Sequence, residues 1–163
     1  MKERIIVFPG SFDPITTGHI DLVKRICPLF DKVFVAIGVN TGKTSLFDLE
    51  TRKLWLLREF SSYPNVVVDH FEGLTVKYCA KVSAHYLLRG LRNASDFDYE
   101  KTISQLNSII GEDLETIFLI SKPEFSHISS TIVREIIKGG GDVKNFVPTE
   151  IASEILEKYK EIV

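Results

Sequence analysis

The residues best suited to chemistry near the N-terminus lie between a short apolar run and the first predicted helix. The run 5–8 is followed by a loop rich in proline and glycine, and Gly18-His19 then opens a stretch with helical spacing. A helix N-terminus carries partial positive charge and free backbone amides, so it attracts phosphate. Gly18 lets a ligand approach the backbone, His19 adds a side-chain donor, and Ser11 adds a hydroxyl at the strand end. This combination predicts a polyphosphate pocket, although an isolated Gly-His pair more often only packs at a helix start.

A second set of candidate residues opens the helix predicted after the last apolar run. The segment 125–131 places the hydroxyls of Ser129, Ser130 and Thr131 at that helix start. Serine and threonine are often only helix caps there. Three hydroxyls beside free amides also form a second phosphate cradle, so both interpretations stay open.

Basic side chains follow two further apolar runs. Arg89-Gly90-Leu91-Arg92 follows the fourth run, where paired guanidinium groups fit phosphate better than a surface salt bridge, with a solvated loop as the alternative. Lys43 follows the second run and either reaches a ligand anion or is solvated. The segment 38–44 resembles a Walker A loop, but three residues separate its glycines where the motif needs four, which argues against a P-loop.

These residues need a scaffold that brings the ends of several strands together. Most apolar runs are continuous rather than alternating, which is typical of strands covered on both faces. The predicted strands are 5–8, 33–39, 66–68, 86–88 and 117–120. Predicted helices begin near Gly18-His19 and cover 49–60, 74–82, 97–110, 131–138 and 148–162. The alternation predicts an α/β fold with a doubly wound, parallel, five-stranded sheet, in a single domain spanning residues 1–163.

In such a sheet, ligands bind outside the carboxyl ends of the strands. The loops expected there are 9–18, 40–48, 69–73, 89–96 and 121–130, and they contain the candidate residues. The sheet therefore predicts that the histidine, the arginines and the hydroxyls share one edge.

Composition narrows the class of protein. The chain has 163 residues, of which 44% are hydrophobic and 26% charged, with a formal net charge of −2. That balance indicates a globular protein and argues against a general nucleic-acid binder. Cys27 and Cys79 are expected to be buried free thiols, and no apolar run reaches membrane-spanning length, so we predict a cytoplasmic protein without membrane contact. The four histidines show no metal-ligand spacing, so no protein-held metal is predicted.

Two motifs resemble those of a known superfamily. Thr16-Thr17-Gly18-His19 and Ile128-Ser129-Ser130-Thr131 are similar to the signatures of the nucleotidyltransferases. Within that superfamily, "PGSFDPITTGHID" and "RGLRNASDFDYE" closely resemble the bacterial phosphopantetheine adenylyltransferases, over essentially the whole chain. The resemblance implies a Rossmann-like fold and transfer of AMP from ATP to 4′-phosphopantetheine, giving dephospho-coenzyme A and pyrophosphate. It also implies magnesium bridging the phosphates, a homohexamer, and feedback inhibition by coenzyme A.

The same resemblance assigns residues to roles. Catalysis would rest on His19, Lys43 and Arg92. The acceptor substrate would contact Ser11, Lys43, Leu74, Thr75 and Arg89. ATP would contact Ser11, Phe12, His19, Gly90, Leu91, Arg92, Glu100, Phe125, Ser126, His127, Ile128, Ser129, Ser130 and Thr131.

The implied chemistry needs no general base. A phosphate monoester has a second pKa of about 6, so the acceptor is already largely dianionic at neutral pH. His19 is then expected to donate a hydrogen bond to the α-phosphate as charge develops there. Three positions depart from the family pattern: Ser11 replaces the usual threonine, Thr41-Gly42 replaces a frequent proline, and His127 replaces an aromatic residue. The alternatives are a nicotinate-mononucleotide adenylyltransferase, a cytidylyltransferase or a non-catalytic nucleotide-binding module.

Overall fold

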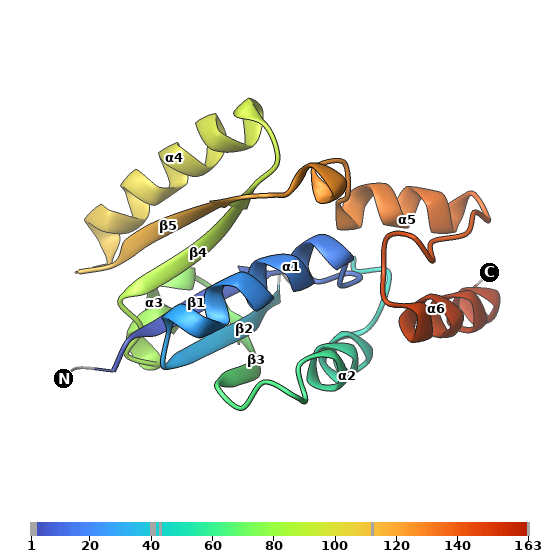
Figure 1. The fold of residues 1–163 in the computed structure, drawn as a ribbon, viewed down its shortest axis with the longest axis horizontal. Coiled ribbons are helices and arrows are strands. Elements are labelled where there is room, and N and C mark those ends of the chain that lie inside the picture. Colours follow the sequence, from blue (N-terminus) through green and yellow to red (C-terminus); the bar gives the residue numbers. More distant parts are fainter. Residues whose placement is uncertain (1–2, 40–41, 43, 112, 163) are drawn as a thin grey trace.

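The computed structural model describes residues 3–39, 42, 44–111 and 113–162 and contains one parallel sheet (Figure 1). Its strands are β1 (Ile5–Gly10), β2 (Lys32–Val39), β3 (Val66–Glu72), β4 (Tyr86–Leu91) and β5 (Glu115–Ile120). The order across the sheet is β3-β2-β1-β4-β5. The chain builds outward from β1 in one direction and then in the other, so the sheet is doubly wound, as the sequence predicts.

Within the described residues, six α-helices connect or follow these strands. They are α1 (Thr17–Ile26), α2 (Leu49–Glu59), α3 (Thr75–Lys81), α4 (Ala94–Ile110), α5 (Ser130–Lys138) and α6 (Thr149–Ile162). Two short 3₁₀ helices, η1 (Cys27–Leu29) and η2 (Pro123–Phe125), complete the elements. The predicted helices are confirmed within three residues. The largest difference is the start of α4, because the Asn93 side chain accepts from the Asp96 N–H and caps the helix before Phe97.

Three of the predicted loops begin later than the sequence pattern indicates. Residues 9–10, 69–72 and 89–91 belong to β1, β3 and β4, and not to the loops in which the sequence placed them. Most of these residues are polar or glycine, so they do not continue the apolar pattern of the strands. Their backbones nevertheless continue the hydrogen-bonded sheet, and Arg89, for example, pairs with Phe118. The longer strands bring these residues to a fixed edge of the sheet.

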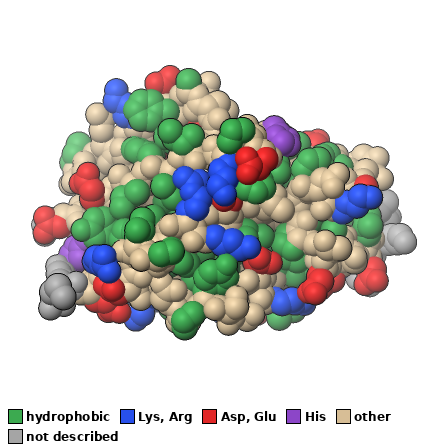
Figure 2. All heavy atoms as spheres, in the orientation of Figure 1, with side chains coloured by type: hydrophobic (Ala, Val, Ile, Leu, Met, Phe, Trp, Pro, Cys, Tyr) green, Lys and Arg blue, Asp and Glu red, His purple; other side chains and the backbone are tan. Residues whose placement is uncertain are grey.

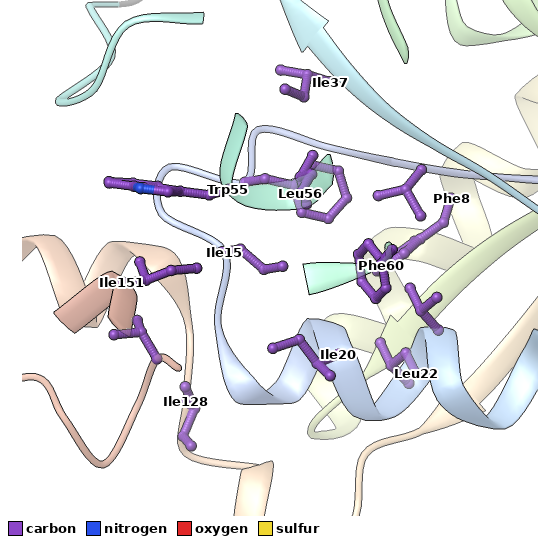
Figure 3. Close-up of a cluster of buried hydrophobic side chains, with 14 of the residues drawn as sticks. Phe8, Ile15, Ile20, Leu22, Ile37, Trp55, Leu56, Phe60, Ile128 and Ile151 are labelled. Carbon is purple, nitrogen blue, oxygen red and sulfur yellow. The ribbon is translucent and has the colours of Figure 1, made fainter. Parts of the chain in front are cut away.

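The larger core lies on the face of the sheet covered by α1 and α2, with α5 and α6 packed beyond them. Figure 3 shows side chains of α1, α2 and α6 around Ile15, which follows β1 and is fully buried. Trp55 and Ile151 join α2 to α6 in the same cluster. On the other face, α3 buries Val76 and Cys79. Packing within the larger core therefore fixes the position of the segment between β1 and α1.

Cys27 and Cys79 are both buried and free, as the sequence predicts.

The helices cover the two faces of the sheet unequally. Along α4, which runs beside β5 in Figure 1, the one residue classed as buried is Glu100. Over the described part of the chain, no helix is long and apolar enough to span a membrane.

Candidate active site

A pocket of about 250 Å³ lies at the carboxyl ends of β1 and β4, where the winding of the sheet changes direction. Its lining comes from five places: the end of β1, the start of α1, the end of β4, the first turns of α4 and the segment 121–130. Open α/β sheets bind ligands at such a switch point. The structure thus brings together the histidine, arginine and hydroxyl motifs that lie far apart in sequence.

His19 lines this pocket at the first turn of α1, and its ring is held by a reciprocal cap. The Thr16 backbone N–H donates to His19 Nδ1 at 3.1 Å, and the His19 N–H donates to Thr16 Oγ1 at 3.4 Å. Because Nδ1 accepts a hydrogen bond from a backbone amide, the neutral ring carries its hydrogen on Nε2. Burial, with a smaller effect from the charge of Arg92, lowers the pKa of His19 to about 4. At neutral pH His19 is therefore an uncharged Nε2–H donor.

The loop between β1 and α1 is held by side chains from distant elements. Asp13 is buried, and its carboxylate accepts from the Leu46 N–H at 2.8 Å and the Phe47 N–H at 2.9 Å. Arg134 donates to the Asp13 carbonyl at 2.7 Å, and Ser130 donates to the Pro14 carbonyl at 2.8 Å. These contacts fix the chain that leads into His19.

Two charged residues that hold this loop, Arg52 and Arg134, are not singled out by the sequence pattern. Arg52 of α2 is buried and donates to the Ser11 carbonyl at 2.8 Å. Neither Arg52 nor Arg134 belongs to a recognisable motif. In the sequence, each is only a charged residue within an otherwise amphipathic helical pattern. Phe12, which lies between the two residues whose carbonyls they bind, has a φ of 45° and is 1% exposed. Its ring meets the His19 ring edge-on with centroids 5.0 Å apart, so Phe12 supports the histidine from the core.

The arginines of the site are ion-paired within the chain. Arg89 donates from Nε to Glu100 Oε2 at 2.7 Å and from a second nitrogen to Oε1, which makes a bidentate pair. Arg92 binds Asp96 in the same way, at 2.8 and 3.0 Å. The sequence favours phosphate binding over a surface salt bridge for these arginines. The structure shows that both form ion pairs within the chain, at the pocket itself. The four charges cancel, so these side chains give the pocket no net positive charge.

The hydroxyls of the 125–131 segment have partners as well. Ser129 Oγ accepts from the Ile132 N–H at 3.2 Å and caps α5. Thr131 Oγ1 accepts from Arg134 at 3.2 Å. The capping interpretation therefore holds for Ser129, while its position still lines the pocket beside the start of α5. The members of this segment that line the pocket are Phe125, Ile128, Ser129 and Ser130.

Other sequence-predicted residues lie outside this lining. Ser11 is exposed just beyond β1, and His127 lies near Phe146, with ring centroids 6.5 Å apart. Ser126 donates to the Pro123 carbonyl at 2.9 Å. Leu91 ends β4 and is buried. Lys43 falls outside the residues that the structure describes.

A second cavity of about 160 Å³ adjoins the first and shares Pro9, Arg89 and Glu100 with it. Thr75, at the start of α3, lines this second cavity, whereas Leu74 caps that helix and is 52% exposed. The Arg89–Glu100 pair thus forms a partition between two hollows. Among the described residues, no group of three or more histidine, cysteine, aspartate or glutamate side chains could hold a metal ion.

Comparison with known proteins first defines the class. Residues 7–136 match the cytidylyltransferase-like family model. The fold is similar to a solved structure from Vibrio parahaemolyticus described as a nicotinate-nucleotide adenylyltransferase, with a TM-score of 0.70, 18% identity, and coverage of 98% of this chain and 97% of the other. The solved structure shows that the fold is shared, and the family model covers most of the chain, so the chain is an enzyme of the nucleotidyltransferase superfamily.

Sequence relatives then define the family. A phosphopantetheine adenylyltransferase from Caldanaerobacter subterraneus subsp. tengcongensis is 44% identical over 97% of this chain and 99% of its own length. One from Flavobacterium psychrophilum is 47% identical over 91% of this chain and 97% of its own length. The chain belongs to the phosphopantetheine adenylyltransferase family.

Proposed function

We propose that the protein transfers AMP from ATP to 4′-phosphopantetheine, giving dephospho-coenzyme A and pyrophosphate, the penultimate step of coenzyme A synthesis. Family membership supports the reaction, and one observation carries the site assignment. His19 is a neutral Nε2–H donor at a helix N-terminus, inside the switch-point pocket and beside a second cavity. This arrangement suits a nucleotide phosphate in the first cavity and an acceptor approaching from the second.

The proposed step is an in-line displacement. An oxygen of the acceptor phosphate attacks the α-phosphorus of ATP, and the bond to the bridging oxygen breaks, so pyrophosphate leaves with that electron pair. The acceptor is already ionised and needs no base. His19 donates to the α-phosphate oxygen as negative charge grows there, and the Thr16 amide keeps the ring in the donating tautomer.

The acceptor is assigned to the second cavity and its rim. Arg89 stands at the shared wall and would meet the acceptor phosphate, together with Ser11 and Lys43. Thr75 lines the cavity, and the exposed Leu74 beside it in sequence would contact the acceptor from outside. The remaining lining mixes hydroxyl and amide groups with apolar side chains, as an amide-bearing pantetheine arm requires: Leu87, Tyr99, Ile103, Ser104, Asn107 and Thr116.

The nucleotide is assigned to the first cavity. Arg92 would face the phosphates near His19, because both line this cavity and the charge of Arg92 contributes to the low pKa of His19. Gly90 and Glu100 lie at the end of β4 and on α4 beside them. The backbone around Phe12 and Leu91 and the segment 125–131 complete the proposed ATP contacts.

Magnesium fits the chemistry of this pocket. The carboxylates of Asp96 and Glu100 are each engaged by an arginine, so the ion would be held mainly by the phosphates of ATP. When bound, it would offset the repulsion between two polyanions that a pocket of cancelled charges cannot offset alone.

We further propose a homohexamer. Helix α4 exposes large apolar side chains that a monomer would leave in water, and Figure 2 shows hydrophobic side chains at the surface over α4 and β5. They are Phe97, Tyr99, Leu106, Ile109 and Ile110, with exposures between 44% and 80%. Light scattering at micromolar concentration is expected to give a mass near six chains, and a stable, active monomer would exclude this assembly.

Regulation and location follow from the proposed pathway. Coenzyme A shares its pantetheine and nucleotide parts with the product, so it is proposed to inhibit by occupying the same two cavities. We place the enzyme in the cytoplasm, without nucleic-acid or membrane partners.

A substrate panel tests the proposal. With ATP and magnesium, pyrophosphate release is expected on addition of 4′-phosphopantetheine and is expected to be small with nicotinate mononucleotide or glycerol 3-phosphate. Turnover with either alternative and none with 4′-phosphopantetheine would overturn the assignment and favour another nucleotidyltransferase.

A further inference from the structure

A carboxylate lines the pocket that is assigned to the phosphates of ATP. Asp96 belongs to the first turn of α4 and is one of the lining residues. A negative charge at this place opposes the binding of a polyanion. The position therefore needs a physical reason beyond the binding of substrate.

Its contacts give that reason. Asp96 Oδ2 accepts from Arg92 Nε at 2.8 Å and from the Arg92 backbone N–H at 3.0 Å, and Oδ1 accepts from a terminal guanidinium nitrogen at 3.0 Å. The Asp96 N–H donates in turn to the Asn93 side chain at 2.9 Å. The carboxylate is thus fixed by the start of α4, and it fixes both the backbone and the fork of Arg92.

Arg92 needs such a support more than other residues of the pocket. Its side chain is 36% exposed, while that of Asp96 is 20% exposed. A long, partly exposed arginine has many rotamers, and binding a phosphate in one geometry costs the loss of that freedom. The opposite wall needs no such support, because His19 is held by the reciprocal cap with Thr16.

We propose that Asp96 is a positioning residue for the transfer reaction, which holds the guanidinium of Arg92 toward the phosphates and cancels its charge in the empty site. This inference rests on the proposed function. It has two opposite consequences. Loss of the carboxylate frees Arg92 and slows the chemical step, yet it also adds one net positive charge to the pocket, so ATP and pyrophosphate bind no less tightly than before.

A purely structural role of Asp96 predicts a different result. An acidic residue in the first turn of a helix commonly stabilises the helix N-terminus, and Asp96 also accepts from a backbone amide. If that is its whole role, Asp96→Asn lowers thermal stability and leaves kcat unchanged. Asp98 supplies the matched control, because it lies two residues further along α4, is exposed, and carries the same charge.

The test compares Asp96→Asn and Asp98→Asn in the otherwise unchanged protein. We expect Asp96→Asn to lower kcat by about tenfold or more, while the Kd of ATP with magnesium, measured by calorimetry, stays the same or falls. Asp98→Asn is expected to change neither by more than about twofold. A normal kcat in Asp96→Asn overturns the proposal, and so does a Kd for ATP that rises in step with the loss of kcat, because that would mean direct contact with the nucleotide.

A double-mutant cycle with Arg92→Ala isolates the coupling. If Asp96 acts on the chemical step through Arg92, adding Asp96→Asn to Arg92→Ala has no further effect on kcat; a further loss of kcat equal to that of Asp96→Asn alone overturns the proposal. Should Asp96→Asn fail to fold, Asp96→Glu keeps the charge but shifts the carboxylate, and an unchanged kcat there also counts against positioning. The measurement of ATP affinity does not involve the acceptor. A wild type that is inactive with 4′-phosphopantetheine therefore refutes the proposed function, while a Kd for ATP that rises in Asp96→Asn refutes the positioning role of Asp96.

Discussion

The two walls of the pocket that contains His19 are built on different physical principles. We define the histidine wall as Thr16, Gly18, His19, Ser129 and Ser130, and the arginine wall as Arg89, Gly90, Arg92, Asp96 and Glu100. On the histidine wall, geometry is set by neutral hydrogen bonds to the backbone, and Thr16 is only 1% exposed. On the arginine wall, geometry is set by ion pairs, one of them at the surface. One wall is preorganised by burial, whereas the other keeps charges that a ligand or solvent can compete for.

The largest expected effect comes from the histidine wall. His19→Ala removes a preorganised donor to developing charge, which typically costs about 10²–10³ in kcat. ATP and 4′-phosphopantetheine are expected to bind within about tenfold of their normal affinity, and stability is expected to change by about 1 kcal/mol, the size of a lost helix cap. Steady-state kinetics, calorimetry and thermal melts measure these three quantities.

The control for this variant is His85→Ala. His85 directly precedes β4 and therefore lies at the end of that strand opposite to the pocket. A His19→Ala protein with near-normal kcat would remove the histidine from the mechanism. Loss of folding would instead reduce its role to packing at the helix start, and the contrast between the walls would disappear.

The second comparison uses one glycine from each wall. A Cβ on Gly90 would lie 2.5 Å from Leu22 Cδ1, so Gly90→Ala must displace the end of the buried Leu22 side chain and is expected to cost about 1 kcal/mol of stability. A Cβ on Gly18 would lie 3.6 Å from Thr16 Oγ1, which is ordinary contact. Gly18→Ala is therefore expected to fold normally and to raise the KM for ATP, by about tenfold if one hydrogen bond is lost.

Urea unfolding and ATP kinetics on the two alanine variants check this pair. A destabilised Gly18→Ala protein, or a Gly90→Ala protein of normal stability, would contradict the assignment of one glycine to ligand approach and the other to packing.

The smallest expected effect concerns pH. Burial and Arg92 lower the pKa of His19 to about 4, whereas an unfolded chain has a histidine pKa near 6.5. Between these two values the unfolded chain binds a proton that the folded chain does not. The contribution of His19 to stability is therefore complete above about pH 6.5 and is lost as the pH falls toward 4, with a slope of at most about 1.4 kcal/mol per pH unit.

Unfolding measured at pH 7 and pH 5 is expected to show a smaller acid loss in His19→Ala than in the wild type. A nitrogen-15 NMR titration of His19 is expected to show the Nε2–H tautomer down to about pH 5. An equal acid loss in both proteins, or a ring that gains a proton near pH 6.5, would mean that the histidine wall is less enclosed than its contacts indicate.

The sequence predicted the scaffold well because its strands are continuous apolar runs and its helices have clear ends. It placed His19 at a helix start, but the tautomer depends on the direction of the Thr16 amide, which no residue pattern encodes. It did not find the partner of Arg89, because Glu100 approaches from the following helix only after β4 and α4 have packed. Asp13 was missed as a buried support because a charged loop residue is usually solvated.

The contacts that hold the β1–α1 loop also bear on the order in which the site can form. Ser130 reaches the Pro14 carbonyl across 116 residues, and Arg134 reaches the Asp13 carbonyl across 121. During synthesis, a ribosome makes the loop and its histidine more than a hundred residues before the side chains that secure the loop. Contacts of such long sequence separation form late and slowly. A nascent chain that ends before α5 therefore carries an unfinished pocket, and catalytic competence appears only after α5 has packed against the loop between β1 and α1.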